Sequence, residues 1–192
     1  DTISATLGVD ALGTSVKAAI IGILIVMLIM LVRYRLAGLV ADWALCIYII
    51  LLFLFIAVVP GIQLTLPGIA GVILGIGMAV DANVVIFERV KEEVRAGRPT
   101  IHAVRIGFKH AMSAVVDANI TTIIAAVVLL FFGTGSVQGF ATTLLLGVIA
   151  SMLTAILITR FLLIRVVRIW PNPALYAANA KPAADETVKE AK

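Results

Sequence analysis

Hydrophobic residues along this chain fall into five long runs, separated by short polar or charged segments. Each run is close to the roughly 20 residues that a helix needs to cross the hydrocarbon of a bilayer. Helices satisfy their own backbone hydrogen bonds in lipid, so the pattern predicts an all-α polytopic membrane protein with five transmembrane helices. The predicted spans are residues 16–32, 38–59, 67–87, 111–132 and 140–164.

The composition agrees with this pattern. Hydrophobic residues make up 62% of the 192 residues and charged residues only 14%, whereas a typical soluble domain is about 25% charged. A soluble enzyme is therefore excluded, and without a nucleophile–base set or metal-ligand spacing we predict no enzymatic activity, cofactor or metal site. The single cysteine, Cys46, lies inside an apolar run and is interpreted as a small apolar filler.

The positive charges predict the orientation. If the N-terminus is outside, Lys17 is the one outer cation, and the other fourteen of the fifteen lysines and arginines lie inside. Loops on the cytoplasmic side are the ones enriched in these residues, which favours an outer N-terminus and an inner C-terminus. The basic balance then indicates attraction to anionic lipid rather than to nucleic acid.

The domain organisation follows from the same pattern. We expect a periplasmic lead-in at 1–15, a membrane domain at 16–165 with a cytoplasmic loop at 88–110, and a disordered tail at 166–192. The chain shows no secretory signal, so a preceding segment is expected to carry its N-terminus across the membrane.

Within the 88–110 loop, "GRP" marks a turn and Thr100 can cap a new helix. Apolar residues then recur on one helical face, which favours a short helix lying on the inner membrane surface. A solvated connector is the alternative. The residues of this face are Ile101, Val104, Phe108 and Ala111.

The tetrapeptide "VDAN" occurs twice in apolar surroundings, at 80–83 and 116–119. In antiparallel spans the two acids, Asp81 and Asp117, would lie at similar depth. A charged carboxylate costs about 2.5–3.5 kcal/mol at the centre of a membrane helix, and removal from water favours its protonated form. Both acids are therefore candidate proton-relay groups. The alternatives are a helix–helix hydrogen bond for Asp81 and a structural role near the interface for Asp117.

At 100° per residue, the third span carries small residues on one side and Asp81 with Gly77, Val84 and Glu88 on the other. Small residues allow close helix packing, so this helix is expected to be surrounded by protein. The first two spans look lipid-facing, and Asp42 is interpreted as an interfacial acid favoured by Arg35 and a helix N-terminus. The packing candidates are Gly68, Gly71, Gly75, Met78 and Ala82 on the third span, and Thr143, Gly147, Ala150, Ser151 and Thr154 on the fifth.

Two long segments, "LTLPGIAGVILGIGMAVDANVVIFERVKEEVRAGR" and "AVVDANITTIIAAVVLLFFGTGSVQGFATTLLLGVIASMLTAILITR", closely resemble the membrane domain of the SecD family. The shorter segments "LGVDAL" and "YRLAGLVADWAL" fit as well, so the resemblance covers residues 7–165. Gly75 departs from it, because many relatives have Thr there, and this widens the packing groove.

The resemblance implies a subunit of the bacterial Sec translocon, in the resistance-nodulation-division superfamily of proton-driven machines. It implies half of a pseudo-symmetric bundle in the cytoplasmic (inner) membrane, with a SecF-like homologous subunit, the SecYEG translocon and a translocating preprotein as partners. Asp81 would be the carboxylate tied to proton passage, and an earlier span and a periplasmic region would precede Asp1. Residues that would orient or hydrate the site are Asn83, Asn119, Thr121 and Thr122.

Two other functions remain open at this stage. The chain could be half of a small-molecule or lipid exporter of the same superfamily, which would need its own porter domain. It could also be a passive translocon scaffold in which Asp81 only packs.

Overall fold

The computed structural model describes residues 2–59 and 65–176, and the surroundings of side chains from Leu12 onward. Five helical segments in this part of the chain are long and apolar enough to cross a membrane, which confirms the predicted fold class. The fifth segment is continuous but changes its winding midway. The elements are α1 (Thr2–Tyr34), α2 (Leu36–Val58), α3 (Leu66–Arg95), α4 (Thr100–Phe132), α5 (Ser136–Leu153), the π-helical segment η1 (Thr154–Thr159), α6 (Arg160–Ile169) and the 3-10 turn η2 (Pro173–Leu175).

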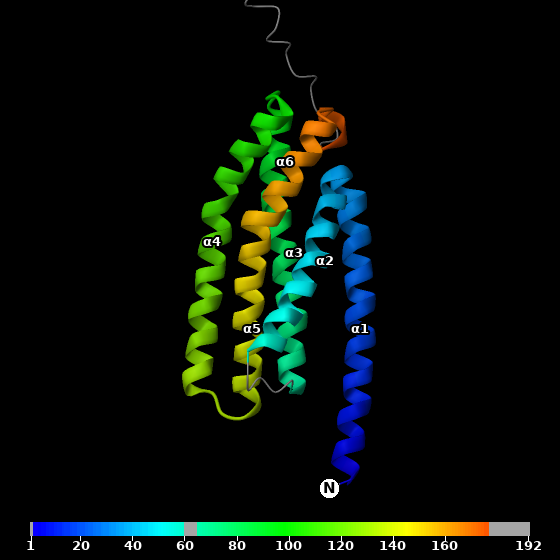
Figure 1. Cartoon of the computed structure of the whole chain (residues 1–192), viewed down its shortest axis with the longest axis vertical. Helices are drawn as coiled ribbons and strands as arrows, with labels where there is room; N and C mark the ends of the chain where they lie inside the picture. The colour runs from blue at the N-terminus through cyan, green and yellow to red at the C-terminus, as the bar shows by residue number, and fades with distance from the viewer. Residues whose placement is uncertain (1, 60–64, 177–192) are drawn as a thin grey trace, which may run out of the picture.

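The helix α3 lies at the centre of the bundle, packed against α4 and α5. In Figure 1, α1 stands at one edge and α2 crosses in front of α3 and α5. Most of the surface of α1 from Leu12 onward is exposed, as expected for a lipid-facing span. The expectation is wrong for one side of α2, where Tyr48 and Leu52 are buried in the core. A helix that crosses the bundle obliquely must bury the face that it turns inward.

The prediction of a separate surface helix after Thr100 is wrong. The α3 helix runs on to Arg95, and α4 begins at Thr100 and continues unbroken through the fourth span. The face predicted to lie on lipid packs instead on the end of α3, where Val104 and Phe108 join a core cluster with Val90. An apolar face of one helix is satisfied equally by lipid or by a neighbouring helix, and the sequence pattern does not distinguish the two.

Two features of the chain bring these helix ends together. A Cβ atom at Gly107 would come within 2.7 Å of the Cα atom of Val90, so only glycine permits this close crossing of α3 and α4. The connecting turn contains Gly97 at φ 84°, a left-handed conformation that favours glycine.

The predicted disordered tail is partly ordered. The helix α6 extends to Ile169, and the segment up to Tyr176 folds back onto the bundle. The Thr100 hydroxyl, expected to cap its own helix, donates instead to the Pro171 carbonyl oxygen at 2.7 Å. The buried Tyr176 hydroxyl donates to the Trp170 carbonyl oxygen at 2.8 Å. Burial raises the pKa of Tyr176 to about 12, so this donor stays protonated near neutral pH. The rest of the predicted tail, 177–192, lies outside the described residues.

Candidate functional site

Small residues bring α3 and α5 into direct contact. The Thr143 hydroxyl occupies the space beside Gly71 and donates to the Gly68 carbonyl oxygen at 2.9 Å. One helical turn further along, a Cβ at Gly75 would lie 3.5 Å from the Cα atom of Gly147. The structure therefore places all four glycines of the predicted packing set at this crossing: Gly68, Gly71, Gly75 and Gly147. This close approach holds the central helix in position.

Tyr48 fills the groove at Gly75, a position that the sequence pattern did not indicate. A Cβ at Gly75 would lie 2.7 Å from the Tyr48 hydroxyl oxygen, and one at Gly147 would lie 3.3 Å from it. The room left by a glycine at position 75 is thus taken by an aromatic side chain from α2. The hydroxyl is buried and has no hydrogen-bond partner among the described residues.

Each VDAN copy presents its acid and its amide to opposite sides of its helix. Two positions correspond to about 200° of rotation, so an Asp facing outward places the following Asn inward. Asn83 and Asn119 are both buried, whereas Asp81 and Asp117 are both exposed on the bundle surface. The repeated tetrapeptide therefore combines an inward contact with an outward carboxyl group.

Both asparagines bind hydroxyl groups of the fifth span. The Asn83 Oδ1 atom accepts a hydrogen bond from Thr159 Oγ1 at 2.9 Å. The Asn119 Oδ1 atom lies 3.5 Å from Ser151 Oγ, whose hydroxyl donates over the shorter distance of 2.9 Å to the Val148 carbonyl oxygen, so this second contact is weaker. Thr159 is the last residue of η1, and a π-helical turn shifts the positions of the residues that follow it. The two copies thus connect α3 and α4 to the same helix.

The carboxylates of Asp81 and Asp117 form no hydrogen bond or ion pair with the part of the chain that the structure describes. The Thr121 hydroxyl donates to the backbone carbonyl oxygen of Asp117, and that of Thr122 to the carbonyl oxygen of Ala118, both at 3.0 Å. These threonines satisfy their own helix rather than either acid. Asp81 is therefore available to water or to a partner protein.

Glu88 lies two turns beyond Asp81 on the same face of α3, in a charged cluster at the end of α1. Its Oε1 atom accepts from the Tyr34 hydroxyl at 3.0 Å and pairs with Lys91 Nζ at 3.3 Å and Arg33 Nη2 at 3.4 Å. Although Glu88 was placed on the Asp81 face, the sequence did not indicate these partners. The cluster ties the C-terminal end of α1 to α3.

The interpretation of Asp42 as an interfacial acid beside Arg35 is wrong. Asp42 is buried, and its Oδ1 atom has no hydrogen-bond partner among the described residues. Arg35 donates instead from Nη1 to the Ala174 carbonyl oxygen at 2.9 Å. The sequence placed Asp42 near the start of its helix but did not indicate its burial.

Replacing Thr159 by Val should destabilise the bundle by about 0.6–1.7 kcal/mol, the average and the maximum measured for hydrogen bonds between membrane helices. The change keeps the side-chain shape and removes the hydroxyl that donates to Asn83. Reversible unfolding in detergent, combined with Asn83→Ala in a double-mutant cycle, measures the coupling. Thr122→Val, which loses only a bond to its own helix, is the matched control. Zero coupling energy between Thr159 and Asn83 would contradict a stabilising hydrogen bond between them.

Comparison with known proteins agrees with this architecture. A model of the family described as "Protein export membrane protein SecD/SecF, C-terminal" matches residues 1–168. The chain is 49% identical to the protein translocase subunit SecD of Acidaminococcus fermentans, over 99% of this chain and 46% of that protein. It is 48% identical to that of Synechocystis, over 93% of this chain and 38% of that protein. The chain thus spans less than half the length of these curated relatives.

A solved structure of a related protein also has a similar fold. The crystal structure of SecDF from Thermus thermophilus, described as a translocon-associated membrane protein, superposes with a TM-score of 0.84 at 40% identity. The match covers 87% of this chain and 23% of that one. These findings confirm the resemblance on the VDAN-containing segments, and the chain belongs to the SecD/SecF C-terminal family of protein export membrane proteins.

Proposed function

We propose that this chain is the membrane part of a SecD-type subunit that uses the proton motive force to assist translocation of secreted chains. The observation that carries the proposal is the position of Asp81, exposed on the central helix with no partner for its carboxylate among the described residues. A membrane carboxyl group of this kind is a functional-site candidate because its ionised form is costly in lipid.

The known relatives favour a role in protein export over a role in small-molecule transport. The most similar proteins cited above are named as protein translocase subunits. An exporter half of the same superfamily would share the acidic helix but would belong with a different set of relatives. A passive scaffold would share the relatives as well, so the two remaining functions differ only in whether Asp81 exchanges protons.

The face of Asp81 is the part of the surface that a homologous SecF-like subunit is proposed to cover. Gly77 has no atom within 4 Å of its Cβ position, and it borders a groove of about 300 Å³ between α1 and α3. Transport paths in such machines commonly form between two related halves. A second half would surround Asp81 with protein and water in place of lipid. The SecYEG translocon and the translocating preprotein are proposed as further partners in the bacterial cytoplasmic membrane.

Cysteines introduced at Gly77 or Val84 should crosslink to the SecF-like subunit in native membranes. The background is Cys46→Ala, because Cys46 is exposed. Ile50→Cys is the matched control, since Ile50 is 68% exposed and lies on α2 rather than on α3. Crosslinked products are identified by mass spectrometry. Labelling of Gly77 and Val84 variants by lipid-soluble reagents alone, with no protein crosslink, would argue against this partner.

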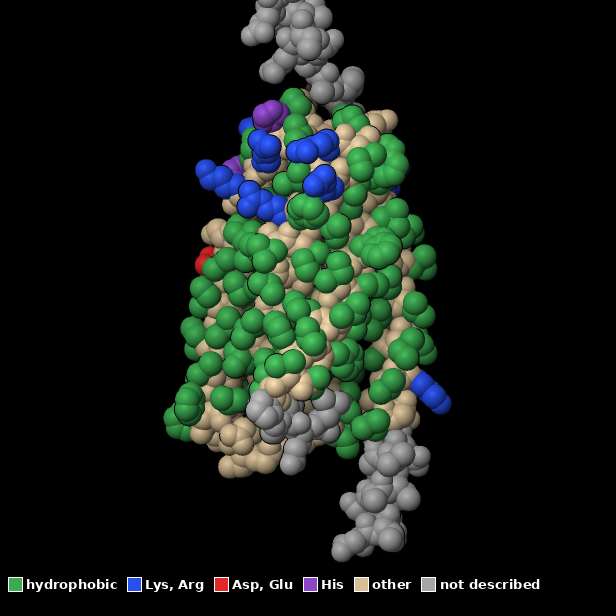
Figure 2. Space-filling view, viewed as in Figure 1, with side chains coloured by type: hydrophobic (Ala, Val, Ile, Leu, Met, Phe, Trp, Pro, Cys, Tyr) green, Lys and Arg blue, Asp and Glu red, His purple; other side chains and the backbone are tan. Residues whose placement is uncertain are grey.

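We also propose that the α3–α4 turn lies on the cytoplasmic side. Figure 2 shows lysine and arginine side chains gathered over one end of the bundle, beyond a wide hydrophobic belt, and Figure 1 places the α3–α4 turn at that end. Cytoplasmic loops are the ones enriched in these residues.

A cysteine at the exposed Ala96, in the Cys46→Ala background, should react with an impermeant thiol reagent only in inverted vesicles. The α4–α5 turn lies at the opposite end of the bundle. A cysteine at Thr134 in that turn is therefore the control and should react only in intact spheroplasts. Labelling of the Ala96 variant in spheroplasts would reverse the proposed topology.

A further inference from the structure

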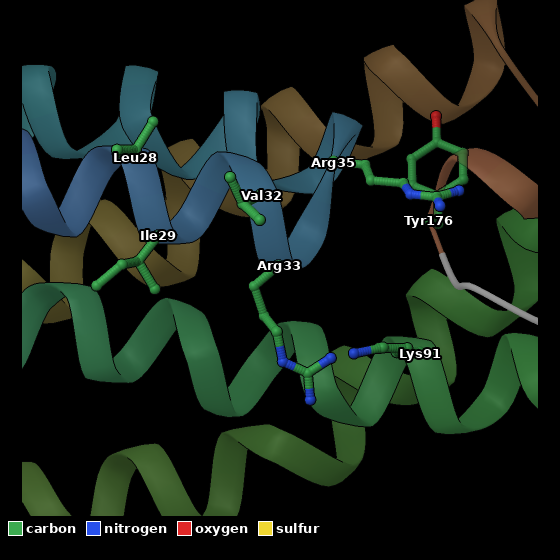
Figure 3. Close-up of a pocket in the computed structure, with 7 residues that line it drawn as sticks. All are labelled: Leu28, Ile29, Val32, Arg33, Arg35, Lys91 and Tyr176. Carbon is green, nitrogen blue, oxygen red and sulfur yellow. The ribbon is translucent and has the colours of Figure 1, made fainter.

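An open pocket of about 470 Å³ lies where the end of α1 meets α3 and the segment after α6. Its wall toward the middle of the bundle is apolar and is formed by Leu28, Ile29 and Val32 of α1. The opposite side carries cations, and Figure 3 shows the side chains of Arg33 and Lys91 reaching toward each other from α1 and α3. Arg35 and Tyr176 close the end of the pocket. The pocket therefore has an apolar half and a cationic half.

The cationic half has more positive charge than the protein neutralises. Glu88 pairs with both Arg33 and Lys91, but three cations line the pocket against this one neighbouring carboxylate. The Lys91 side chain is 3% exposed and has Glu88 as its one hydrogen-bond partner among the described residues. An ammonium group has three donors, so the pocket offers buried donors for a further anion.

Arg35 is held in position at some conformational cost. It has φ 52°, a left-handed conformation that is uncommon for any residue other than glycine. Its Nη1 atom donates to the Ala174 carbonyl oxygen at 2.9 Å, which fixes the guanidinium beside Tyr176. A guanidinium has five N–H donors, so donors remain for an oxyanion. Strained residues of this kind tend to occur at binding sites.

We propose that this pocket binds one anionic phospholipid, with the phosphate on Arg33, Arg35 and Lys91 and an acyl chain along α1. The pocket lies at the C-terminal end of a helix long and apolar enough to span a membrane, and the ends of such helices are where headgroups meet hydrocarbon. Lysine and arginine near such a surface attract anionic lipid. The apolar wall continues into exposed residues of the same helix, which a soluble phosphate could not use: Leu24, Ile25, Leu28 and Ile29. The inference does not depend on the proposed export function.

Native mass spectrometry of the full membrane protein tests the site, after extraction from bilayers of phosphatidylglycerol and phosphatidylcholine. The wild-type protein should retain one phosphatidylglycerol in preference to phosphatidylcholine. Arg33→Gln combined with Arg35→Gln should lower that preference by about tenfold or more. Arg105→Gln combined with Lys109→Gln removes the same charge from exposed positions of α4 outside the pocket, and should leave the preference within about twofold.

A second variant separates lipid from free phosphate and does not depend on the arginines. Val32 is 74% exposed, so Val32→Asn should not affect folding but should weaken contact with the acyl chain. Retention of phosphatidylglycerol should fall in this variant, and inorganic phosphate at matched ionic strength should not displace the lipid from the wild-type protein. Displacement by phosphate, equal loss in the Arg105/Lys109 control, or no lipid preference in the wild-type protein would each overturn the proposal.

Discussion

Replacing Asp81 by Asn should remove the gradient-dependent part of preprotein export while leaving the protein folded and assembled. The amide keeps the size and much of the hydrogen bonding of the neutral acid, but it has no proton to release. Asp81 is exposed and has no partner among the described residues, so the free energy of unfolding should change by less than about 0.5 kcal/mol. Loss of export without loss of protein is the signature of a proton-handling group.

The assay is export of a secreted precursor into inverted vesicles, with the proton gradient on or off and at matched subunit levels. Asp81→Glu should keep partial activity, because it retains a carboxyl group one methylene further out. Asp117→Asn should have a milder effect, since Asp117 lies on α4 and not on the central helix α3. Full gradient-dependent export by the Asp81→Asn protein would exclude the relay assignment and favour a passive scaffold.

Replacing Gly71 by Leu should have the largest effect on stability of any change considered for this chain. A Cβ atom at position 71 would overlap the Thr143 hydroxyl and approach the Phe140 carbonyl oxygen to 3.0 Å. The remaining atoms of a leucine would have to push α5 away from α3. Overpacking of this kind typically costs about 1–3 kcal/mol, and occasionally more. We therefore expect a marked loss of folded protein and a lower unfolding temperature in detergent.

Gly77→Leu is the matched control on the same helix. No atom lies within 4 Å of the Cβ position there, so the isolated chain should keep its thermal stability. If the Asp81 face is covered by a homologous subunit, the same substitution should reduce co-purification of that subunit. Equal stability of the two leucine variants, measured by thermal unfolding, would show that the α3–α5 crossing is less tightly packed than the geometry indicates.

The helices themselves could be predicted from the sequence because membrane insertion depends on local composition. Five apolar runs are enough to identify five spans, since any backbone segment in hydrocarbon must form a helix or a closed sheet. Helical periodicity also separated the faces of α3, with Gly71 and Gly75 against α5 and Asp81 exposed on another side. These features can be predicted from the rise and rotation per residue of an α-helix alone.

Contacts between residues far apart in the sequence could be identified only from the tertiary structure. Thr159 meets Asn83 across 76 positions, through a π-helical turn that has no sequence signal. Tyr48 enters the groove at Gly75 because α2 crosses the bundle obliquely, whereas the hydropathy of α2 had predicted a lipid-facing helix. Hydropathy indicates that a residue avoids water, but not whether lipid or protein replaces it.

Tertiary packing also decided two features that hydropathy left open: what covers the apolar face after Thr100, and how the cationic pocket forms. The apolar face of Val104 and Phe108 was correctly identified, and only the packing of α4 on α3 showed what covers it. Positive charge near Arg33, Arg35 and Lys91 was visible in the sequence as an orientation signal. That these three side chains converge on one pocket follows from α1 lying beside α3 and from the chain turning back after α6. The sequence by itself therefore determined the spans, the faces of α3 and the distribution of charge. Tertiary packing decided which helix faces contact one another, because each contact depends on how segments far apart in the chain cross.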